Sequence, residues 1–94
     1  MKLRREVAFE ADLNENLDCI ADDDVIEAIK VLDAIDDQAA LLVDNPELGR
    51  PGRVAGTREL VISGTRLIVA YRVQGEEIQL LRLLHGSQRW PRRM

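Results

Sequence analysis

The fold is decided by residues 59–85, which read ELVISGTRLIVAYRVQGEEIQLLRLLH. Three runs rich in apolar residues in this stretch are separated by two short segments that contain glycine, 63–65 and 74–76. Apolar runs of this length with turn residues between them are typical of strands joined by tight hairpin turns. We therefore expect three consecutive strands, at 59–63, 66–73 and 77–85.

The middle one of these expected strands is apolar at almost every position. Strands of this kind are covered on both faces, or nearly so. Helices supplied by the rest of the chain can cover one face of the sheet. The other face is expected to stay partly open or to await a partner.

Upstream of this stretch the apolar period becomes helical. Apolar residues on one helical face predict a helix over 11–21, and a second helix is expected from about Val25 to about Val43. Asp24 followed by Glu27 resembles a capping box at the start of the second helix, and Asn45-Pro46 ends it. The buried stripe of the second helix is expected to comprise Val25, Ala28, Ile29, Leu32, Ile35, Ala39 and Leu42.

The remaining segments complete the predicted architecture. Residues 5–9 alternate weakly and are interpreted as a first strand, with Val7 and Phe9 on one face. Residues 47–57 contain three glycines and a proline and are interpreted as a loop. The expected order is β-α-α-β-β-β, an α+β fold in which a small antiparallel sheet packs against an N-terminal helical hairpin. Residues 1–94 are expected to form one domain.

Charge and composition narrow the classes of function. The net charge is −4, and residues 6–47 hold fourteen acidic side chains but only one basic side chain, Lys30. Direct nucleic-acid binding is disfavoured, because binding to phosphates requires a surplus of positive charge. No apolar run is long enough to span a membrane, and no signal peptide is evident. With Cys19 as the single cysteine, we expect a reduced, cytoplasmic protein without a metal or cofactor.

Several short motifs follow one another in an order that resembles a known family. They are NPELGRPGRV at 45–54, GTREL at 56–60, YRV at 71–73, IQLL at 78–81, LHG at 84–86 and WP at 90–91. The chain is therefore identified as resembling the RelE/ParE superfamily, and within it the ParE-like toxins of plasmid stabilisation systems. The resemblance implies the toxin of a type II toxin–antitoxin system, which arrests growth by inhibiting DNA gyrase and is neutralised by a cognate antitoxin.

The superfamily has a second arm, the RelE-like endoribonucleases that cleave messenger RNA on the ribosome. Such chemistry needs an acid, a base and cations around the scissile phosphate. Here Gly86 stands where the RelE-like arginine is expected, the C-terminal tyrosine is missing, and the helical hairpin is acidic. These departures favour a ParE-like inhibitor over an enzyme, and the ribonuclease remains the alternative.

The candidate residues for contact with the target or the antitoxin are Arg58, Arg72, Arg82, His85, Arg89 and Trp90. His85, the only histidine, is interpreted as a strand-end residue rather than as a catalytic acid or base. Arg72 and Arg82 have two interpretations, cations on an open sheet face or partners of Glu59, Glu76 or Glu77.

For the remaining residues of interest, a structural role is favoured over a role in catalysis or target binding. Arg58 and Glu59 are expected to pair across strands, and Tyr71 is expected in the core with its hydroxyl at the surface. Trp90 is expected to anchor the tail, and Arg89 belongs to a basic terminus that could also touch the target.

The resemblance also implies how the antitoxin binds. Antitoxins of this family are flexible chains that become ordered on binding. We expect an amphipathic antitoxin helix across the toxin and an extended segment added to a sheet edge, with antitoxin carboxylates meeting Arg72, Arg82 and Arg89.

Overall fold

The computed structural model describes all of residues 1–94 and contains two helices and five strands. The elements are β1 (Lys2–Arg5), α1 (Val7–Asp23), α2 (Val25–Ala40), a 3₁₀ turn η1 (Leu41–Val43), β2 (Arg50–Pro51), β3 (Arg58–Val61), β4 (Leu67–Gln74) and β5 (Glu77–His85). The predicted α+β class and the order of helices and long strands are confirmed. The short strand β2 lies inside the segment that the sequence indicated only as a loop.

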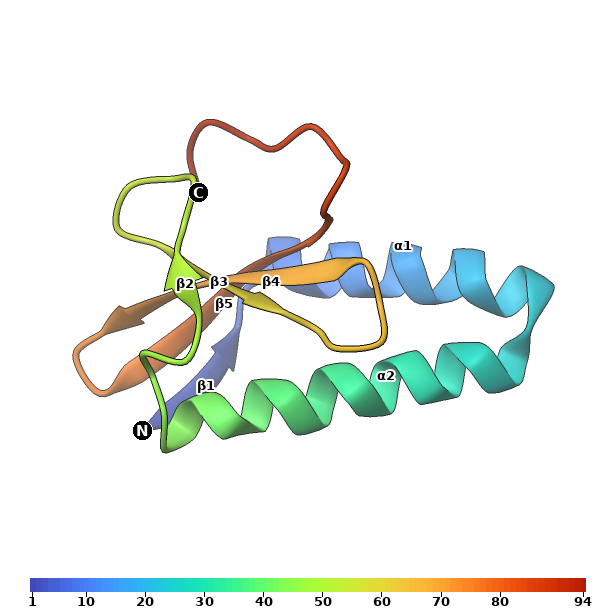
Figure 1. Ribbon diagram of the computed structural model, residues 1–94, viewed down its shortest axis with the longest axis horizontal. Helices are drawn as coiled ribbons and strands as arrows, with labels where there is room; N and C mark the ends of the chain where they lie inside the picture. The colour runs from blue at the N-terminus through green and yellow to red at the C-terminus, as the bar shows by residue number, and fades with distance from the viewer.

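The five strands form one sheet in the order β1-β5-β4-β3-β2 (Figure 1). The pairs β2–β3, β3–β4 and β4–β5 are antiparallel, as expected for a meander. The strand β1 instead pairs parallel with β5, with Leu3 opposite Ile78. The sheet is therefore mixed, because the helical hairpin returns the chain to the far side of the sheet before the meander begins.

The prediction of a first strand at 5–9 was wrong. The strand ends at Arg5, and Val7 and Phe9 belong to α1. Phe9 and Leu13 stand one helical turn apart and are 0% and 4% exposed, so helical spacing determines how Phe9 reaches the core. In a segment this short, the alternation of apolar residues that is typical of a strand cannot be told apart from the first turn of a helix.

The second helix was predicted correctly, except for part of its buried stripe. The Asp24 side chain accepts a hydrogen bond from the backbone N–H of Glu27 at 3.1 Å, which is the N-cap expected from the sequence. Ala28, Ile35, Ala39 and Leu42 are buried and Leu32 is half-buried, but Val25 and Ile29 are exposed. The reason is that the helical hairpin extends beyond the end of the sheet (Figure 1). The first turns of α2 therefore have no sheet beneath them.

The two faces of the sheet are covered by different parts of the chain. The helices pack on one face, where Val69, Tyr71 and Leu83 join the main core. On the other face, Ile68, Ala70 and Leu84 are each at most 5% exposed. The segment after β5 lies on the side of the sheet opposite α2 (Figure 1), and Gly86 approaches the Ile68 side chain. Around Ile68, Ala70 and Leu84 the second face is therefore closed by the chain itself. For this region the expectation of a face that stays partly open or awaits a partner was wrong.

Candidate functional site

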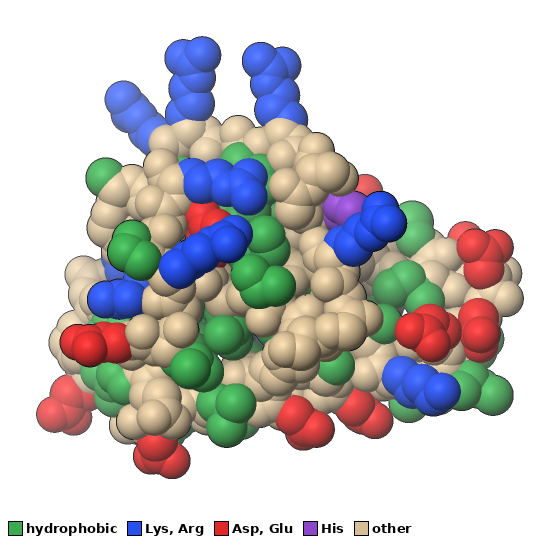
Figure 2. Space-filling model, viewed as in Figure 1, with side chains coloured by type: hydrophobic (Ala, Val, Ile, Leu, Met, Phe, Trp, Pro, Cys, Tyr) green, Lys and Arg blue, Asp and Glu red, His purple; other side chains and the backbone are tan.

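Charge is divided between two ends of the molecule. Lys and Arg side chains gather over the C-terminal segment and the loop after β2, while acidic side chains line the helical hairpin (Figure 2). The division follows the sequence, because the acidic residues 6–47 form the hairpin and the arginines are concentrated after it. The basic end therefore suits an acidic partner, and the acidic hairpin suits a basic one.

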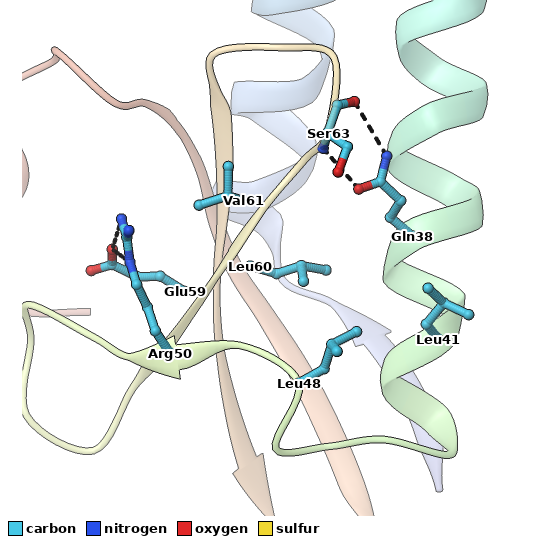
Figure 3. Close-up of a pocket in the computed structure, with 8 residues that line it drawn as sticks. All are labelled: Gln38, Leu41, Leu48, Arg50, Glu59, Leu60, Val61 and Ser63. Carbon is cyan, nitrogen blue, oxygen red and sulfur yellow. Dashed lines mark hydrogen bonds and ion pairs between the residues drawn. The ribbon is translucent and has the colours of Figure 1, made fainter.

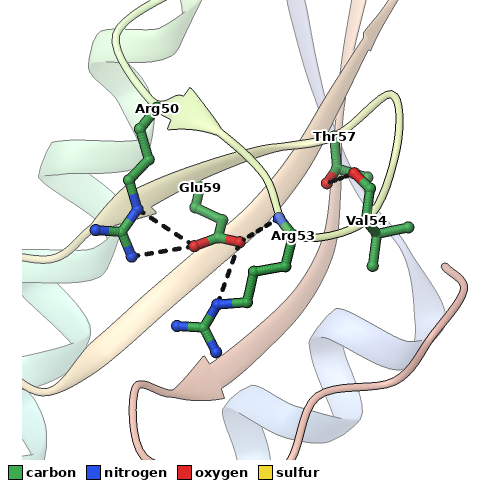
Figure 4. Close-up of polar contacts among 5 residues, drawn as sticks. All are labelled: Arg50, Arg53, Val54, Thr57 and Glu59. Carbon is green, nitrogen blue, oxygen red and sulfur yellow. Dashed lines mark hydrogen bonds and ion pairs between the residues drawn. The ribbon is translucent and has the colours of Figure 1, made fainter.

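A buried carboxylate organises the arginine-bearing end. Glu59 is 2% exposed and accepts hydrogen bonds from the Arg50 guanidinium at 3.1 and 3.3 Å and from the Arg53 backbone N–H at 2.7 Å (Figure 4). The Arg53 side chain approaches the second carboxylate oxygen at 3.6 Å. A buried carboxylate with this many donors fixes the loop between β2 and β3.

Arg58 and Glu59 were both expected to pair across strands, and of the two only Glu59 forms an ion pair with a side chain of the neighbouring strand. The Arg58 guanidinium donates to the backbone carbonyl of Gly49 at 2.7 Å and approaches that of Glu47 at 3.5 Å. Neighbours along a strand point to opposite faces of the sheet, so Arg58 and Glu59 cannot share a partner there. Arg58 therefore holds the loop before β2, and Arg50 is the cross-strand partner of Glu59.

Tyr71 lies in the core, but its hydroxyl does not reach the surface. The side chain is fully buried, and its hydroxyl donates to the Pro46 carbonyl at 2.8 Å and accepts from the Gly49 N–H at 2.8 Å. Burial raises the pKa of Tyr71 above its ordinary value, against a smaller lowering by the Gly49 hydrogen bond. The neutral phenol thus holds the loop after η1 through these two hydrogen bonds, and it is unsuited to act as a base.

Removal of this hydroxyl should destabilise the fold. Tyr71→Phe leaves a buried N–H and a carbonyl without partners, so we expect the free energy of unfolding to fall by about 2–4 kcal/mol. Because the pKa of Tyr71 is raised in the folded state, its contribution is complete below about pH 10 and is lost as the pH rises through the folded-state pKa. Urea melts of both proteins between neutral and strongly alkaline pH measure this. The difference between them should shrink at alkaline pH, and a pH-independent difference would contradict the assignment.

Arg82 has an acidic partner that sequence reasoning missed. Its guanidinium donates to Asp12 of α1 at 2.7 and 3.0 Å, and the same carboxylate accepts from the Leu83 backbone N–H at 2.9 Å. The hydrogen bonds that Arg82 donates to Asp12 raise the pKa of Arg82, against a smaller lowering by burial. Asp12 thereby satisfies a backbone N–H on the edge of β5 that β1 does not reach. A β-bulge interrupts the β4–β5 register nearby, after Ala70. The expected partners Glu59, Glu76 and Glu77 lie elsewhere.

The side-chain partner of Arg72 is an amide rather than a carboxylate. Its guanidinium donates to the Gln79 side-chain oxygen at 2.9 and 3.2 Å, across the β4–β5 pair. Arg72 and Gln79 lie opposite each other in the register, on the sheet face away from the helices. Because an amide satisfies hydrogen bonds but not charge, Arg72 can still receive an external carboxylate.

The three C-terminal candidates lie at the end of β5 and on the segment that follows it. His85 Nδ1 lies 2.9 Å from the Ser87 hydroxyl, and the His85 N–H donates to the Gln88 side chain at 3.0 Å. Arg89 is exposed. The Arg53 guanidinium stacks on the Trp90 ring, 4.0 Å from its centroid, while the indole N–H is buried without an acceptor. Trp90 therefore anchors the tail, through Arg53, to the buried Glu59.

The structure thus does not bring the six candidate residues into one cluster. Arg58 and Arg82 form internal hydrogen bonds, and Arg72 bonds to Gln79 across the sheet. His85 ends β5, and Arg89 and Trp90 lie on the segment after it. No group of histidine, cysteine and acidic residues is arranged to hold a metal ion. No helix is both long and apolar enough to cross a membrane.

A groove lies at the edge of β3, where β2 leaves the strand uncovered. Only Arg58 and Glu59 of β3 pair with β2, so the edge beside Leu60 and Val61 has no neighbouring strand. The groove has a volume of about 390 Å³ and is partly apolar. It is lined by Gln38, Leu41, Leu48, Arg50, Glu59, Leu60, Val61 and Ser63 (Figure 3). Sequence reasoning did not find it, because its walls come from three segments distant in the chain.

Comparison with solved structures agrees with this architecture. A chain of the chromosomal ParDE toxin–antitoxin system from P. aeruginosa superposes with a TM-score of 0.82 at 32% identity, covering 90% of this chain and 95% of that one. At this identity and coverage, the shared fold places the chain in the RelE/ParE superfamily of small toxins.

Sequence comparison gives the family. The sequence model described as the ParE toxin of the type II toxin–antitoxin system parDE matches residues 3–90. A curated candidate toxin, Y4kP of Sinorhizobium fredii (strain NBRC 101917 / NGR234), is 36% identical over 72 residues, 77% of this chain and 74% of its own length. The chain belongs to the ParE toxin family. As the toxin of a type II system, it has a cognate antitoxin as its partner.

Proposed function

We propose that this toxin arrests growth by inhibiting DNA gyrase, that it does so as a binding protein rather than as an enzyme, and that it acts in the cytoplasm. Family membership supports the toxin function. The negative net charge supports a protein target over direct binding to nucleic acid.

The main support for a non-enzymatic mechanism is that the side chains that could take part in RNA cleavage already form internal hydrogen bonds or ion pairs. RNA cleavage needs an acid, a base and cations that converge on one phosphate. Here the Tyr71 hydroxyl is buried between backbone groups, Arg82 is held by Asp12, and Glu59 is enclosed by two arginines. Each group is occupied with holding the fold together, and they do not face a common space.

The test is a comparison of two kinds of damage in bacteria that express the toxin. Gyrase inhibition should produce double-strand DNA breaks that disappear in a host with a toxin-resistant gyrase variant. Ribosome-dependent cleavage would instead cut messenger RNA, which primer extension detects as discrete 5′ ends within coding regions. Messenger RNA cleavage before any DNA break would contradict the proposal and favour the RelE-like alternative.

His85 should be dispensable for toxicity. The Ser87 hydroxyl is the hydrogen-bonding partner of its ring, and no acidic or basic side chain lies within hydrogen-bonding distance. We expect His85→Gln to keep toxicity within a few-fold, since glutamine can still accept or donate a hydrogen bond there. The measurement is the inducer concentration that halves the growth rate, with protein levels matched by immunoblot. A folded variant that has lost toxicity by orders of magnitude would mean that His85 acts chemically.

We further propose that the antitoxin binds in two parts. The groove beside Leu60 and Val61 suits an extended segment, because an uncovered strand edge offers backbone hydrogen bonds next to apolar walls. Arg72 and Arg89 suit antitoxin carboxylates, because neither has an acidic partner within the chain. Arg82, expected to join them, already has Asp12 and contributes less.

A further inference from the structure

An exposed apolar patch lies at the start of α2. Val25, Ile26 and Ile29 are 61%, 67% and 55% exposed and occupy adjacent positions on the first turns of the helix. We call these three residues the hairpin tip patch. The helical hairpin extends past the sheet at this end (Figure 1), so neither the sheet nor the tail covers them.

Three large aliphatic side chains at this end are more than the helical hairpin needs for its own packing. Leu13 of α1 and Val31 and Ile35 of α2 belong to one buried core cluster, which does not include the three residues of the patch. A cluster of exposed aliphatic side chains with a polar rim is typical of a protein interaction site. The hairpin tip patch therefore requires an occupant that is itself apolar at the centre of the contact.

The rim of the patch identifies the charge of that occupant. Four exposed acidic residues flank the patch in the sequence: Asp22, Asp23, Glu27 and Asp33. None of them forms an ion pair within the chain. Lys30 is the only Lys or Arg between residues 6 and 47. A second copy of the chain meeting tip to tip would bring like charges together, which is unfavourable. The complementary occupant carries lysines or arginines around an apolar centre.

We propose that the hairpin tip patch is the surface by which the toxin docks on its target enzyme. This proposal rests on the proposed inhibition of gyrase. An enzyme that binds DNA presents basic surfaces, because neutralisation of phosphates dominates DNA binding. Those surfaces suit the carboxylates of the rim, and the aliphatic side chains of the patch supply the short-range contact. The antitoxin groove and Arg72 lie elsewhere, so each partner has its own surface.

The two parts of the surface should contribute in different ways. Rim carboxylates steer association and make it sensitive to salt, whereas the apolar centre holds the complex once formed. Neutralisation of Asp22 and Asp23 to asparagine should therefore weaken the salt dependence of association with gyrase. Loss of Ile26 and Ile29 should mainly speed dissociation.

The experiment measures binding of the full-length toxin to purified gyrase and, separately, to its cognate antitoxin. The test variant is Ile26→Ser with Ile29→Ser, and the matched control is Val7→Ser, another exposed aliphatic residue at the far end of α1. Because all three side chains are exposed, the variants should melt like the wild type. We expect the test variant to bind gyrase at least about 10-fold more weakly, since two aliphatic contacts are lost. The control variant should bind like the wild type, and all should bind the antitoxin equally.

Each other outcome has a definite meaning. If the wild type binds gyrase and the test variant binds as tightly, the hairpin tip patch is not the docking surface, although the proposed function stands. If the test variant loses the antitoxin and keeps gyrase, the patch belongs to the antitoxin and the proposal is overturned. If the wild type itself does not bind gyrase, the proposed function fails, and this proposal fails with it.

Discussion

Expression of this chain alone should stop the growth of bacterial cells and reduce the number of colony-forming units by orders of magnitude. The expectation follows from membership of the ParE toxin family, whose sequence model covers residues 3–90 of the chain. Co-expression of the protein encoded by the neighbouring gene should restore growth, because the cognate antitoxin sequesters the toxin. Plating on inducing and non-inducing media measures both effects.

A variant that removes an internal contact provides the control for this prediction. Glu59→Ala leaves the Arg50 guanidinium and the Arg53 backbone N–H without the buried carboxylate that they bind, and it should destabilise the loop between β2 and β3. Cells that express this variant should grow better than cells that express the wild type. Normal growth in the presence of soluble, folded wild-type protein would contradict the assignment of toxicity.

The second large effect is expected when the C-terminal half of the antitoxin binds. A partner that binds only the folded toxin, present at 100 times its Kd, stabilises the toxin by about 2.7 kcal/mol. A change of 1 kcal/mol moves the Tm of a domain this size by about 4–8 °C, so the Tm should rise by roughly 10–20 °C. Differential scanning calorimetry of the toxin with and without the antitoxin segment measures the shift.

Substitutions locate this contact on the toxin. Leu48→Glu places a charge in the groove beside β3, and Arg72→Ala removes a cation that has no acidic partner within the chain. Both residues are at least partly exposed, so the variants should melt near the wild type when alone and gain less from the antitoxin. The control is Ile26→Ser at the hairpin tip patch, which should keep the full gain. An unchanged gain in both groove variants would exclude the two-part contact proposed here.

The meander was accessible to sequence reasoning because its information is local. Apolar runs and glycine-containing turns sufficed to predict three strands at 59–63, 66–73 and 77–85, within two residues of the observed bounds. Gly64 and Gly75 have positive φ angles of 82° and 62°, which is why glycine marks both turns. The start of α2 was equally local, since Asp24 and Glu27 lie within one turn.

The features that were missed depend on tertiary contacts. Asp12 is 70 residues from Arg82, and nothing near either residue indicates the pair. The exposure of Val25 and Ile29 depends on how far the hairpin extends beyond the sheet, whereas apolar periodicity reports only which residues share a helix face. The groove requires α2, β3 and the loop before β2 to be placed together. Sequence pattern therefore predicted the elements, and the surfaces available to partners required the assembled structure.

Inhibition of purified gyrase is the most direct test of the central claim. The toxin, freed from its antitoxin, is added to gyrase, relaxed plasmid and ATP, and both supercoiling and cleaved DNA are followed on agarose gels. Our account predicts that supercoiling falls with toxin concentration, that cleaved plasmid accumulates, and that adding the antitoxin restores supercoiling. Unchanged supercoiling at toxin concentrations that arrest growth, with messenger RNA cut on purified ribosomes instead, would contradict it.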